Sequence, residues 1–177
     1  MSVMGLDLSM RIGIGYDVHA LVADRPLVIG GVTIPYEKGL EGHSDADVLV
    51  HAVSDAILGA ARLGDIGEHF PDSDPRYENA DSIELLRQVK ALVDGAGLRV
   101  VDIDSVIVAQ APRLTPYRDE MRLNIANALC LSIESVGVKA TTTEHLGFEG
   151  RGEGIAAQVV ALLERCNGPV AGFFGIV

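Results

Sequence analysis

The sequence contains no tryptophan and only two cysteines, Cys130 and Cys166, which lie far apart and outside any Cys-x-x-Cys pattern. This spacing argues against a disulfide framework and against a cysteine zinc site. No stretch approaches the roughly 18 apolar residues that a membrane-spanning helix needs. The opening segment MSVMGLDLSM lacks the basic region and apolar core of a secretory signal. We therefore expect a cytoplasmic location.

Basic residues are also scarce, with 14 Lys and Arg against 25 Asp and Glu and a net charge of −11. Such a balance opposes binding to nucleic acid or to an anionic membrane surface. A phosphorylated substrate would need metal ions or locally placed cations.

The length of 177 residues and the 48% hydrophobic content predict one globular domain. We assign residues 11–177 to this domain and residues 1–10 to a flexible N-terminal extension, and we consider a packed or subunit-facing role for the apolar segment 168–177.

The pattern of apolar residues predicts the order strand, hairpin, helix, helix, strand, helix, strand, helix. The fold class that follows is α+β, a two-layer sandwich in which a mixed sheet carries helices on one face plus a small hairpin. The expected elements are a strand at 11–21, a hairpin around Gly30-Gly31, a helix within 42–65, a helix from Asp81 to about Gly95, a strand at 100–110, a helix beginning at Thr115-Pro116, a strand at 136–143 and a closing helix at 152–166.

Local signals mark where the helices begin. Ser44 with Asp47 three residues later has the form of a capping box, and Asp81 with Glu84 repeats it before the second helix. Thr115 and Pro116 supply an N-cap and an N1 proline for the third helix. In that helix we expect the apolar side chains to face inward, namely Met121, Ile125, Ala128 and Leu129.

The first strand carries two residues that commonly bind metal ions. Because successive side chains on a strand point to opposite faces, Asp17 and His19 share one face with Gly13 and Gly15. We expect the glycines to leave open space beside the two polar groups and the opposite face to pack against the core, with Ile12, Ile14, Tyr16 and Val18.

A third ligand is expected from the following helix. Asp47, His51 and Asp55 recur at steps of four residues and form one polar stripe, which can turn His51 toward the strand ligands. Asp17, His19 and His51 then suit a tetrahedral zinc ion with an open fourth position. The alternative is that His51 belongs only to a solvated stripe.

Three further segments could meet an anionic ligand. His43 and Ser44 lie at an expected helix N-terminus, which favours anions, although they could serve as a cap alone. The segment ATTTEHLGFEGRGEG, residues 140–154, combines hydroxyls with Glu144, glycines and Arg151, but it lacks the ending of a P-loop. It could hold a diphosphate with magnesium on Glu144, or be a simple strand-to-helix loop. The Asp- and Pro-rich loop 64–80 is too long for a mere connector.

Several long motifs together resemble the 2-C-methyl-D-erythritol 2,4-cyclodiphosphate synthase family. They are DVHAL at 17–21, HSDADVLVHAVSDAILGAARLGDIGEHFPDSDP at 43–75, AQAPRLTPY at 109–117 and VKATTTEHLGFEGRGEGIA at 138–156. The resemblance spans residues 11 to about 165. It implies a cyclising phosphorus-oxygen lyase of the non-mevalonate isoprenoid pathway. Such an enzyme converts 4-diphosphocytidyl-2-C-methyl-D-erythritol 2-phosphate into 2-C-methyl-D-erythritol 2,4-cyclodiphosphate and releases CMP.

The resemblance also implies a quaternary structure and two kinds of metal ion. The family is homotrimeric, with sheets packed about a threefold axis, active sites between adjacent subunits and a central channel in which an isoprenoid phosphate could bind. Zinc, or another divalent ion, would bind at the Asp/His/His site. Magnesium or manganese would bridge the substrate diphosphate at Glu144.

The site residues follow by motif. His43 and Thr142 take the catalytic positions, where they would contact phosphate. The substrate-binding positions are Asp17, Val18, His19, His43, Ser44, Asp65, Ile66, Gly67, Phe70, Pro71, Asp72, Ser73, Asp74, Ala109, Gln110, Ala111, Pro112, Arg113, Leu114, Thr115, Thr141, Thr142, Thr143, Glu144, Phe148 and Arg151. His145 stands where such sequences often carry lysine, which bears on the details of pocket contacts.

Two other functions are compatible with the same residues. A zinc-dependent phosphoester hydrolase would use the metal to activate water and would give no cyclic product. A non-enzymatic trimer that binds metal or isoprenoid phosphate would keep its biological role after loss of the zinc ligands.

Overall fold

The computed structural model describes residues 10–166. The proposed N-terminal extension lies outside these residues except for Met10, which begins the first strand, and the apolar segment 168–177 lies wholly outside them. No helix within 10–166 is long and apolar enough to cross a membrane.

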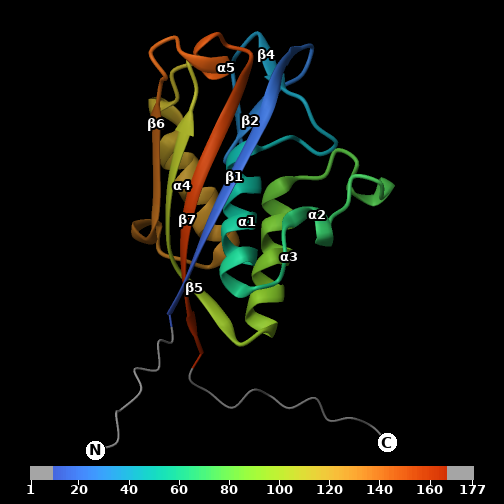
Figure 1. Ribbon diagram of the computed structural model, residues 1–177, viewed down its shortest axis with the longest axis vertical. Coiled ribbons are helices and arrows are strands. Elements are labelled where there is room, and N and C mark those ends of the chain that lie inside the picture. Colours follow the sequence, from blue (N-terminus) through green and yellow to red (C-terminus); the bar gives the residue numbers. More distant parts are fainter. Residues whose placement is uncertain (1–9, 167–177) are drawn as a thin grey trace, which may run out of the picture.

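A twisted mixed sheet forms one layer of the molecule (Figure 1). Within residues 10–166 its five strands run in the order β4-β1-β7-β5-β6. Neighbouring strands pair antiparallel except β5 and β6, which pair parallel. The strands are β1 (Met10–Ala23), β4 (Lys38–Leu40), β5 (Leu98–Val108), β6 (Val136–Thr141) and β7 (Gly154–Arg165).

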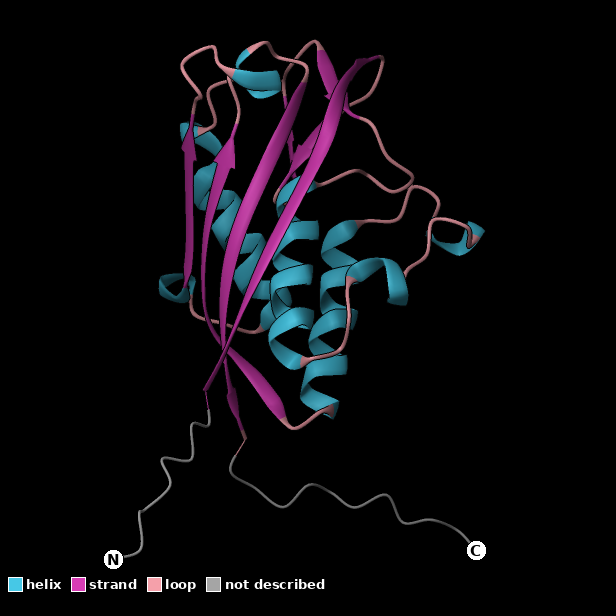
Figure 2. Ribbon diagram, viewed as in Figure 1, coloured by secondary structure: helices cyan, strands magenta, loops and turns pink. Residues whose placement is uncertain are grey.

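The longer helices cover one face of this sheet and lie behind it in the view of Figures 1 and 2. They are α1 (Val48–Ala61), α3 (Ser82–Gly95) and α4 (Arg118–Leu129). Short helical turns are α2 (Ile66–His69), η1 (Pro75–Tyr77), η2 (Thr115–Tyr117), η3 (Ile133–Ser135) and α5 (Gly147–Gly150). The predicted α+β architecture, with helices on one face of a mixed sheet, is confirmed.

The predicted hairpin is also present. Strands β2 (Leu27–Ile29) and β3 (Val32–Ile34) pair antiparallel around Gly30 and Gly31. Both glycines have positive φ angles, 61° and 70°, which the two-residue turn requires.

The closing helix predicted at 152–166 is wrong, because this segment forms β7. Its alanines, leucines and glutamates favour a helix, but β7 lies in the middle of the sheet and pairs with β1 on one side and β5 on the other. Every second side chain from Ile155 to Leu163 is buried, as a central strand requires. Tertiary pairing therefore overrides the intrinsic helix preference.

The two faces of β1 are the reverse of what we expected from the sequence. Gly13 and Gly15 do not border open space, because an added Cβ on either would lie 1.9 Å from a backbone carbonyl oxygen of α1. The glycines let the helix rest directly on the strand. The apolar side chains of β1 lie on the opposite, uncovered face with Ile12 67% and Ile14 64% exposed. We call this uncovered surface the apolar sheet face; it comprises Ile12, Ile14, Tyr16, Val18 and Val160.

Two predicted helix starts are also wrong. The N-cap of α1 is Asp47 rather than Ser44, and its Oδ1 accepts hydrogen bonds from the N–H groups of Leu49 and Val50. Asp47 also accepts hydrogen bonds from the N–H groups of Gly30 and Gly31, at 2.9 and 2.6 Å, and its side chain is fully buried. It therefore does not belong to the predicted polar stripe. This burial raises the pKa of the Asp47 carboxyl.

At the third helix, Thr115 does not act as the N-cap, because residues 115–117 form the separate turn η2 and α4 begins at Arg118. The inward-facing residues predicted for this helix are buried, as expected. The Asp81 cap of α3 is confirmed, since its side chain accepts from the Ile83 N–H at 2.8 Å.

Replacing Gly15 with alanine tests the close contact between β1 and α1. We expect Gly15→Ala to lower the free energy of unfolding by about 3 kcal/mol or more, because neither backbone can yield without separating strand from helix. The matched control is Gly59→Ala on α1, where an added Cβ meets nothing within 4 Å. That variant should gain about 0.5–1 kcal/mol through helix propensity. Denaturant unfolding measures both changes, and equal effects would contradict the contact.

Candidate active site

Asp17, His19 and His51 converge as the sequence predicts. Asp17 Oδ2 lies 3.0 Å from His19 Nε2 and 3.1 Å from His51 Nδ1, and the two imidazole nitrogens are 3.2 Å apart. The first two residues lie on β1 and His51 lies on α1. One carboxylate oxygen and two imidazole nitrogens form a donor set that fits a divalent cation such as zinc.

The backbone orients both strand ligands. The Val18 N–H donates to Asp17 Oδ1 at 2.8 Å, which leaves Oδ2 free to face the histidines. His19 Nδ1 lies 2.6 Å from the carbonyl oxygen of Glu41. Because a carbonyl can only accept, Nδ1 carries a hydrogen, and in the neutral imidazole Nε2 is left with its lone pair.

The triad is strongly coupled electrostatically. Burial alone would raise the pKa of Asp17, but hydrogen bonds and charge from His19 and His51 hold it well below its usual range. Burial likewise disfavours the imidazolium of His19, yet Asp17 outweighs this effect and raises the pKa of His19. A carboxylate that stays ionised is ready to bind a cation.

The triad opens into a cavity of about 240 Å³, which we call the metal-side pocket. Nine of the predicted site residues line it: Asp17, His19, His43, Ser44, His51, Ile66, Gly67, Phe70 and Asp72. Among the described residues, His43 Nε2 is a buried nitrogen without a hydrogen-bond partner. The pocket therefore offers a free imidazole nitrogen beside the metal ligands.

Four further residues line this pocket and were not predicted as site residues: Gly42, Asp55, Tyr77 and Leu85. Asp55 could have been found, because it follows His51 by four residues on the predicted stripe. Its Oδ1 accepts from the Ile66 N–H at 2.8 Å and so ties the loop to α1. Burial raises the pKa of this carboxyl. Tyr77 packs edge-on against Phe70 with ring centres 5.3 Å apart, a contact that sequence spacing does not reveal.

A second group of predicted residues forms a separate cavity of about 290 Å³, the edge pocket, where β5 and β6 end. It is lined by Ala109, Gln110, Pro112, Arg113, Leu114, Thr115, Ala140, Thr141 and Thr142. Next to it, Thr142 Oγ1 donates to Glu144 at 2.8 Å, and the His145 N–H donates to the side-chain oxygen of Gln110 at 3.3 Å. Glu144 is exposed.

The remaining predicted residues line neither pocket: Val18, Asp65, Pro71, Ser73, Asp74, Ala111, Thr143, Glu144, Phe148 and Arg151. Asp65 caps the short helix α2, and Asp74 forms an ion pair with Arg76 at 2.5 Å. Arg151 pairs with Glu153 at 2.8 Å. The loop after Thr141 connects two strands through α5, so the alternative of a strand-to-helix loop is wrong.

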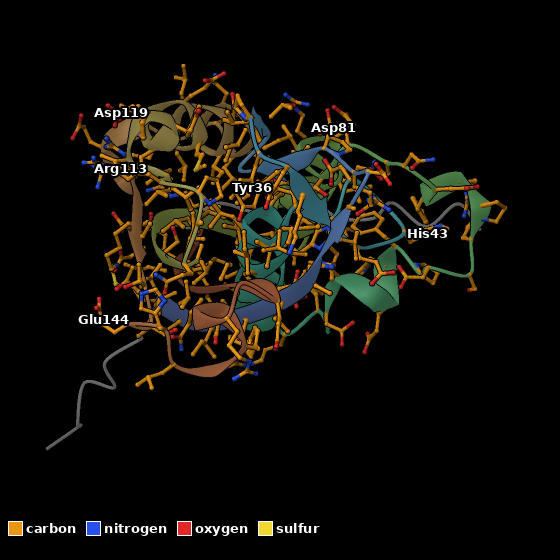
Figure 3. The ribbon with its side chains drawn as sticks, turned by 90° about the horizontal axis from the view of Figure 1, so that it is seen from above. Tyr36, His43, Asp81, Arg113, Asp119 and Glu144 are labelled. Atoms are coloured by element: carbon orange, nitrogen blue, oxygen red, sulfur yellow. The ribbon has the colours of Figure 1, made fainter. Side chains whose placement is uncertain are left out.

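The two pockets lie on opposite sides of the chain. His43 of the metal-side pocket and Arg113 of the edge pocket, with Glu144 beside it, are labelled at opposite sides of Figure 3. The strand order explains this separation, because β1 lies near one edge of the sheet and β6 forms the other. One chain therefore carries two halves of the predicted site that do not meet.

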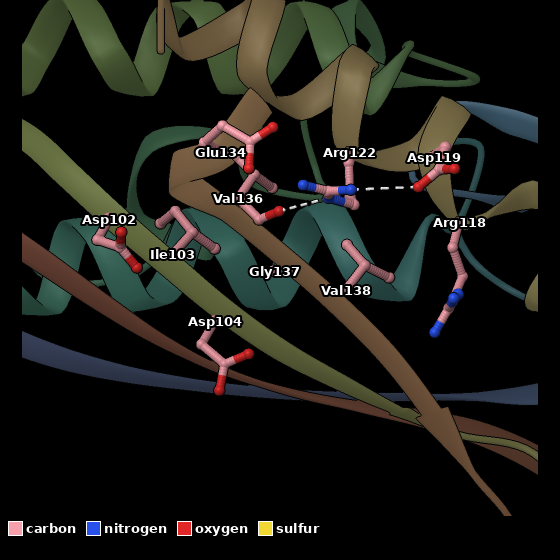
Figure 4. A pocket seen from close by; sticks show the side chains of 10 residues that line it. All are labelled: Asp102, Ile103, Asp104, Arg118, Asp119, Arg122, Glu134, Val136, Gly137 and Val138. Atoms are coloured by element: carbon pink, nitrogen blue, oxygen red, sulfur yellow. Dashed lines mark hydrogen bonds and ion pairs between the residues drawn. The ribbon is translucent and has the colours of Figure 1, made fainter. Parts of the chain in front are cut away.

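A third depression, of about 400 Å³, lies beside β6 and α4 (Figure 4). Three of its charged side chains, Arg122, Asp119 and Asp104, are paired within the protein. Arg122 donates to the carbonyl oxygens of Val136 and Ile133 and to Asp119, while Asp104 binds Lys139. None of the predicted site residues lines it.

Comparison with known proteins is consistent with this geometry. The YgbB family model matches residues 10–164. The chain belongs to this family. The relative named 2-C-methyl-D-erythritol 2,4-cyclodiphosphate synthase from Geotalea uraniireducens (strain Rf4) is 64% identical over 156 residues, which cover 88% of this chain and 99% of that protein.

Solved structures of relatives have the same fold. The bifunctional IspDF from Campylobacter jejuni matches with a TM-score of 0.85 and 47% identity over 88% of this chain, which corresponds to 42% of that longer chain. IspF from Plasmodium falciparum, in a CDP complex, matches with a TM-score of 0.79 and 31% identity over 90% of this chain and 98% of that one.

Removing one ligand of the triad tests the metal site. We expect the purified protein to bind roughly one zinc ion per chain and Asp17→Ala to weaken that binding about 100-fold or more, because two imidazoles remain without the carboxylate. Equilibrium dialysis with metal analysis measures this change. The control is Asp94→Ala, which removes an exposed carboxylate paired only with Lys90. Equal zinc binding by both variants would contradict the site.

Proposed function

We propose that the chain converts 4-diphosphocytidyl-2-C-methyl-D-erythritol 2-phosphate into 2-C-methyl-D-erythritol 2,4-cyclodiphosphate with release of CMP. The observation that carries this proposal is the convergence of Asp17, His19 and His51 at the mouth of the metal-side pocket. Membership of the YgbB family and relatives named for this synthase support it.

The reaction places modest demands on the protein. An oxygen of the 2-phosphate attacks the β-phosphorus, the bond from that phosphorus to the bridging oxygen breaks, and CMP leaves with the bonding electrons. Phosphoryl transfer of this kind depends on positioning and on neutralising charge rather than on covalent catalysis. Two rigid pockets that hold the two ends of the substrate suit this requirement.

We assign the metal ions to two places. Asp17, His19 and His51 would hold zinc or another divalent ion, and exposed Glu144 would contribute one carboxylate to a magnesium or manganese ion that is otherwise held by substrate phosphates. Bound there, the ions would supply Lewis-acid polarisation of phosphate oxygens. They would also offset the repulsion between an acidic chain of net charge −11 and an anionic substrate.

The chain's own polar groups complete the phosphate site in this proposal. His43 would donate a hydrogen bond to phosphate from its unpartnered Nε2. Ser44 Oγ accepts from the Ala46 N–H, which leaves its hydroxyl hydrogen for the ligand. Thr142 would contact the diphosphate beside Glu144, to which it already donates.

The two ends of the substrate fit the two pockets. Residues 65–67 and 70–74, tied to α1 through Asp55, would hold the methylerythritol phosphate end, with Asp72 accepting from a hydroxyl group. The edge pocket would hold the cytidine end. Phe148 and Arg151, which lie on and after α5, would make further contacts.

We also propose that the active enzyme is a homotrimer. The two pockets of one chain face away from each other, so a neighbouring copy must supply the second half of each site. The apolar sheet face is suited to burial between copies, because Ile12, Ile14 and Tyr16 are more than half exposed in the single chain. An isoprenoid phosphate in the central channel and a cytoplasmic location stay predictions.

A phosphorus NMR time course with the cytidine substrate tests the reaction. We expect cyclic diphosphate and CMP to form in equal amounts, with formation dependent on both zinc and magnesium. Linear phosphate products would indicate the hydrolase instead, and unreacted substrate with both metals present would favour a binding protein.

Mixing two inactive variants tests the shared site. Asp17→Ala disables the metal-side half and Glu144→Ala the other, so each homotrimer should be inactive. Trimers assembled at random from equal amounts should recover about one quarter of the wild-type activity, because each site then combines two intact halves in one case out of four.

Native mass spectrometry, with one variant carrying an affinity tag, establishes that mixed trimers have formed. Activity no higher than the sum of the separate variants in such a mixed trimer would contradict a site shared between chains.

A further inference from the structure

We propose that Asp45 and Ser82 are positioning residues for the metal ligand His51. Together they form a hydrogen-bond relay that accepts a hydrogen from Nε2 of this imidazole and so supports the tautomer that leaves Nδ1 bare toward the metal. The importance of the relay for turnover rests on the proposed function.

The two nitrogens of His51 face different surroundings. Nδ1 points to Asp17 Oδ2 and His19 Nε2, at 3.1 and 3.2 Å, where a cation would bind. Nε2 points the other way, to Ser82 Oγ at 3.0 Å and to Ser44 Oγ at 3.2 Å. Neutral imidazole carries one hydrogen, and only a nitrogen without it can bind a metal.

The partner of Ser82 makes Ser82 Oγ an acceptor for a hydrogen on His51 Nε2. The Ser82 hydroxyl donates to Asp45 Oδ1 in a short hydrogen bond, and the Ser82 N–H donates to Oδ2 of the same carboxylate at 3.0 Å. An ionised carboxylate can only accept, so it takes the single hydroxyl hydrogen of Ser82. Ser82 Oγ can then only accept from His51, which requires the hydrogen on Nε2.

Ser44 does not impose the same choice. Its Oγ accepts from the Ala46 N–H at 3.2 Å, and no carboxylate or carbonyl among the described residues holds its hydroxyl hydrogen. That hydroxyl could therefore donate to His51 or accept from it. Ser82 has its hydrogen committed, and so it favours the hydrogen on Nε2. Asp17 Oδ2, which can also only accept, competes for this hydrogen at Nδ1 until a cation binds there.

The relay is rigid and lies behind the pocket wall. Ser82 is fully buried as the first residue of α3, and neither Ser82 nor Asp45 lines the metal-side pocket. The segment containing Asp45 is tied to the start of α3, since the Asp45 N–H donates to Ala80 O at 3.2 Å and the Asn79 N–H donates to His43 O at 2.9 Å. These residues act through His51 and do not touch substrate.

The two histidine ligands are thus oriented by different devices. His19 donates to the carbonyl of Glu41, which has a fixed polarity. His51 depends on a hydroxyl whose direction is fixed only by Asp45. Loss of such an outer partner typically weakens metal binding about 10- to 100-fold. Without it, part of the metal-free histidine adopts a tautomer or a ring orientation that cannot bind the metal.

Side-chain NMR of the zinc-loaded protein tests the relay directly. Long-range proton–nitrogen correlations at slightly alkaline pH report which nitrogen of each neutral histidine carries hydrogen. We expect a slowly exchanging hydrogen on Nε2 of wild-type His51, held by Ser82, and faster exchange of that hydrogen with water in Ser82→Ala and in Asp45→Asn. A wild-type His51 with its hydrogen on Nδ1 would overturn the proposal without any variant.

Zinc affinity, measured by competition with a chromophoric chelator, gives the second readout. We expect both variants to bind zinc about 10- to 100-fold more weakly than wild type. The control is Asp81→Ala, which removes the cap of α3 beside Ser82 but leaves the relay intact, and whose zinc affinity should stay within about threefold. Ser82→Thr keeps a hydroxyl and should restore most of the affinity.

Folded variants of Ser82 and Asp45 with wild-type zinc affinity would overturn the relay, as would an equal loss in Asp81→Ala. Neither measurement uses substrate. Absence of the cyclic product would therefore refute the proposed function while leaving the relay to be judged on tautomer and affinity alone.

Discussion

The contact between β1 and α1 is the constraint on which the rest of the structure depends. Gly13 and Gly15 have no side chains, so the backbone of α1 rests on the strand at Ala52 and Ala56. This approach brings His51, one residue before Ala52, level with Asp17 and His19. A side chain at either glycine would push the helix outward and separate the third ligand from the first two. The metal site is thus a product of how closely two backbones can pack.

The same packing decides what the other face of the sheet presents. Because glycines occupy the helix side of β1, the large apolar side chains of that strand lie on the uncovered side, in one surface with Val160 of β7. The two pockets lie near the sheet edges on either side of this surface. In the proposed function each pocket is half of a site and the apolar face between them is buried between copies, so assembly and catalysis are linked.

Sequence reasoning succeeded where the signal is local. Strand alternation placed Asp17 and His19 together, helical spacing turned His51 toward them, and Gly30-Gly31 marked a turn. Strand alternation shows which residues share a face, but it does not show which face the helices cover. For this reason we predicted open space on the face of β1 that carries the glycines. The residues of β7 favour a helix, so the sequence did not reveal this strand, which is stabilised by its pairing with β1 and β5. Ser82 and Asp45, 37 positions apart, meet through tertiary structure that no short motif encodes.

The parallel pairing of β5 and β6 has a consequence for how the edge pocket is built. Within the described sheet it is the one parallel pair, and the chain must cross over through α4 to make it. Parallel strands end at the same edge, so the loops after Val108 and Thr141 emerge side by side and the Ala109 N–H donates to Thr141 O at 3.0 Å. The wall of the pocket is therefore set by strand direction, and the crossover itself begins in this wall with Ala109 and Gln110.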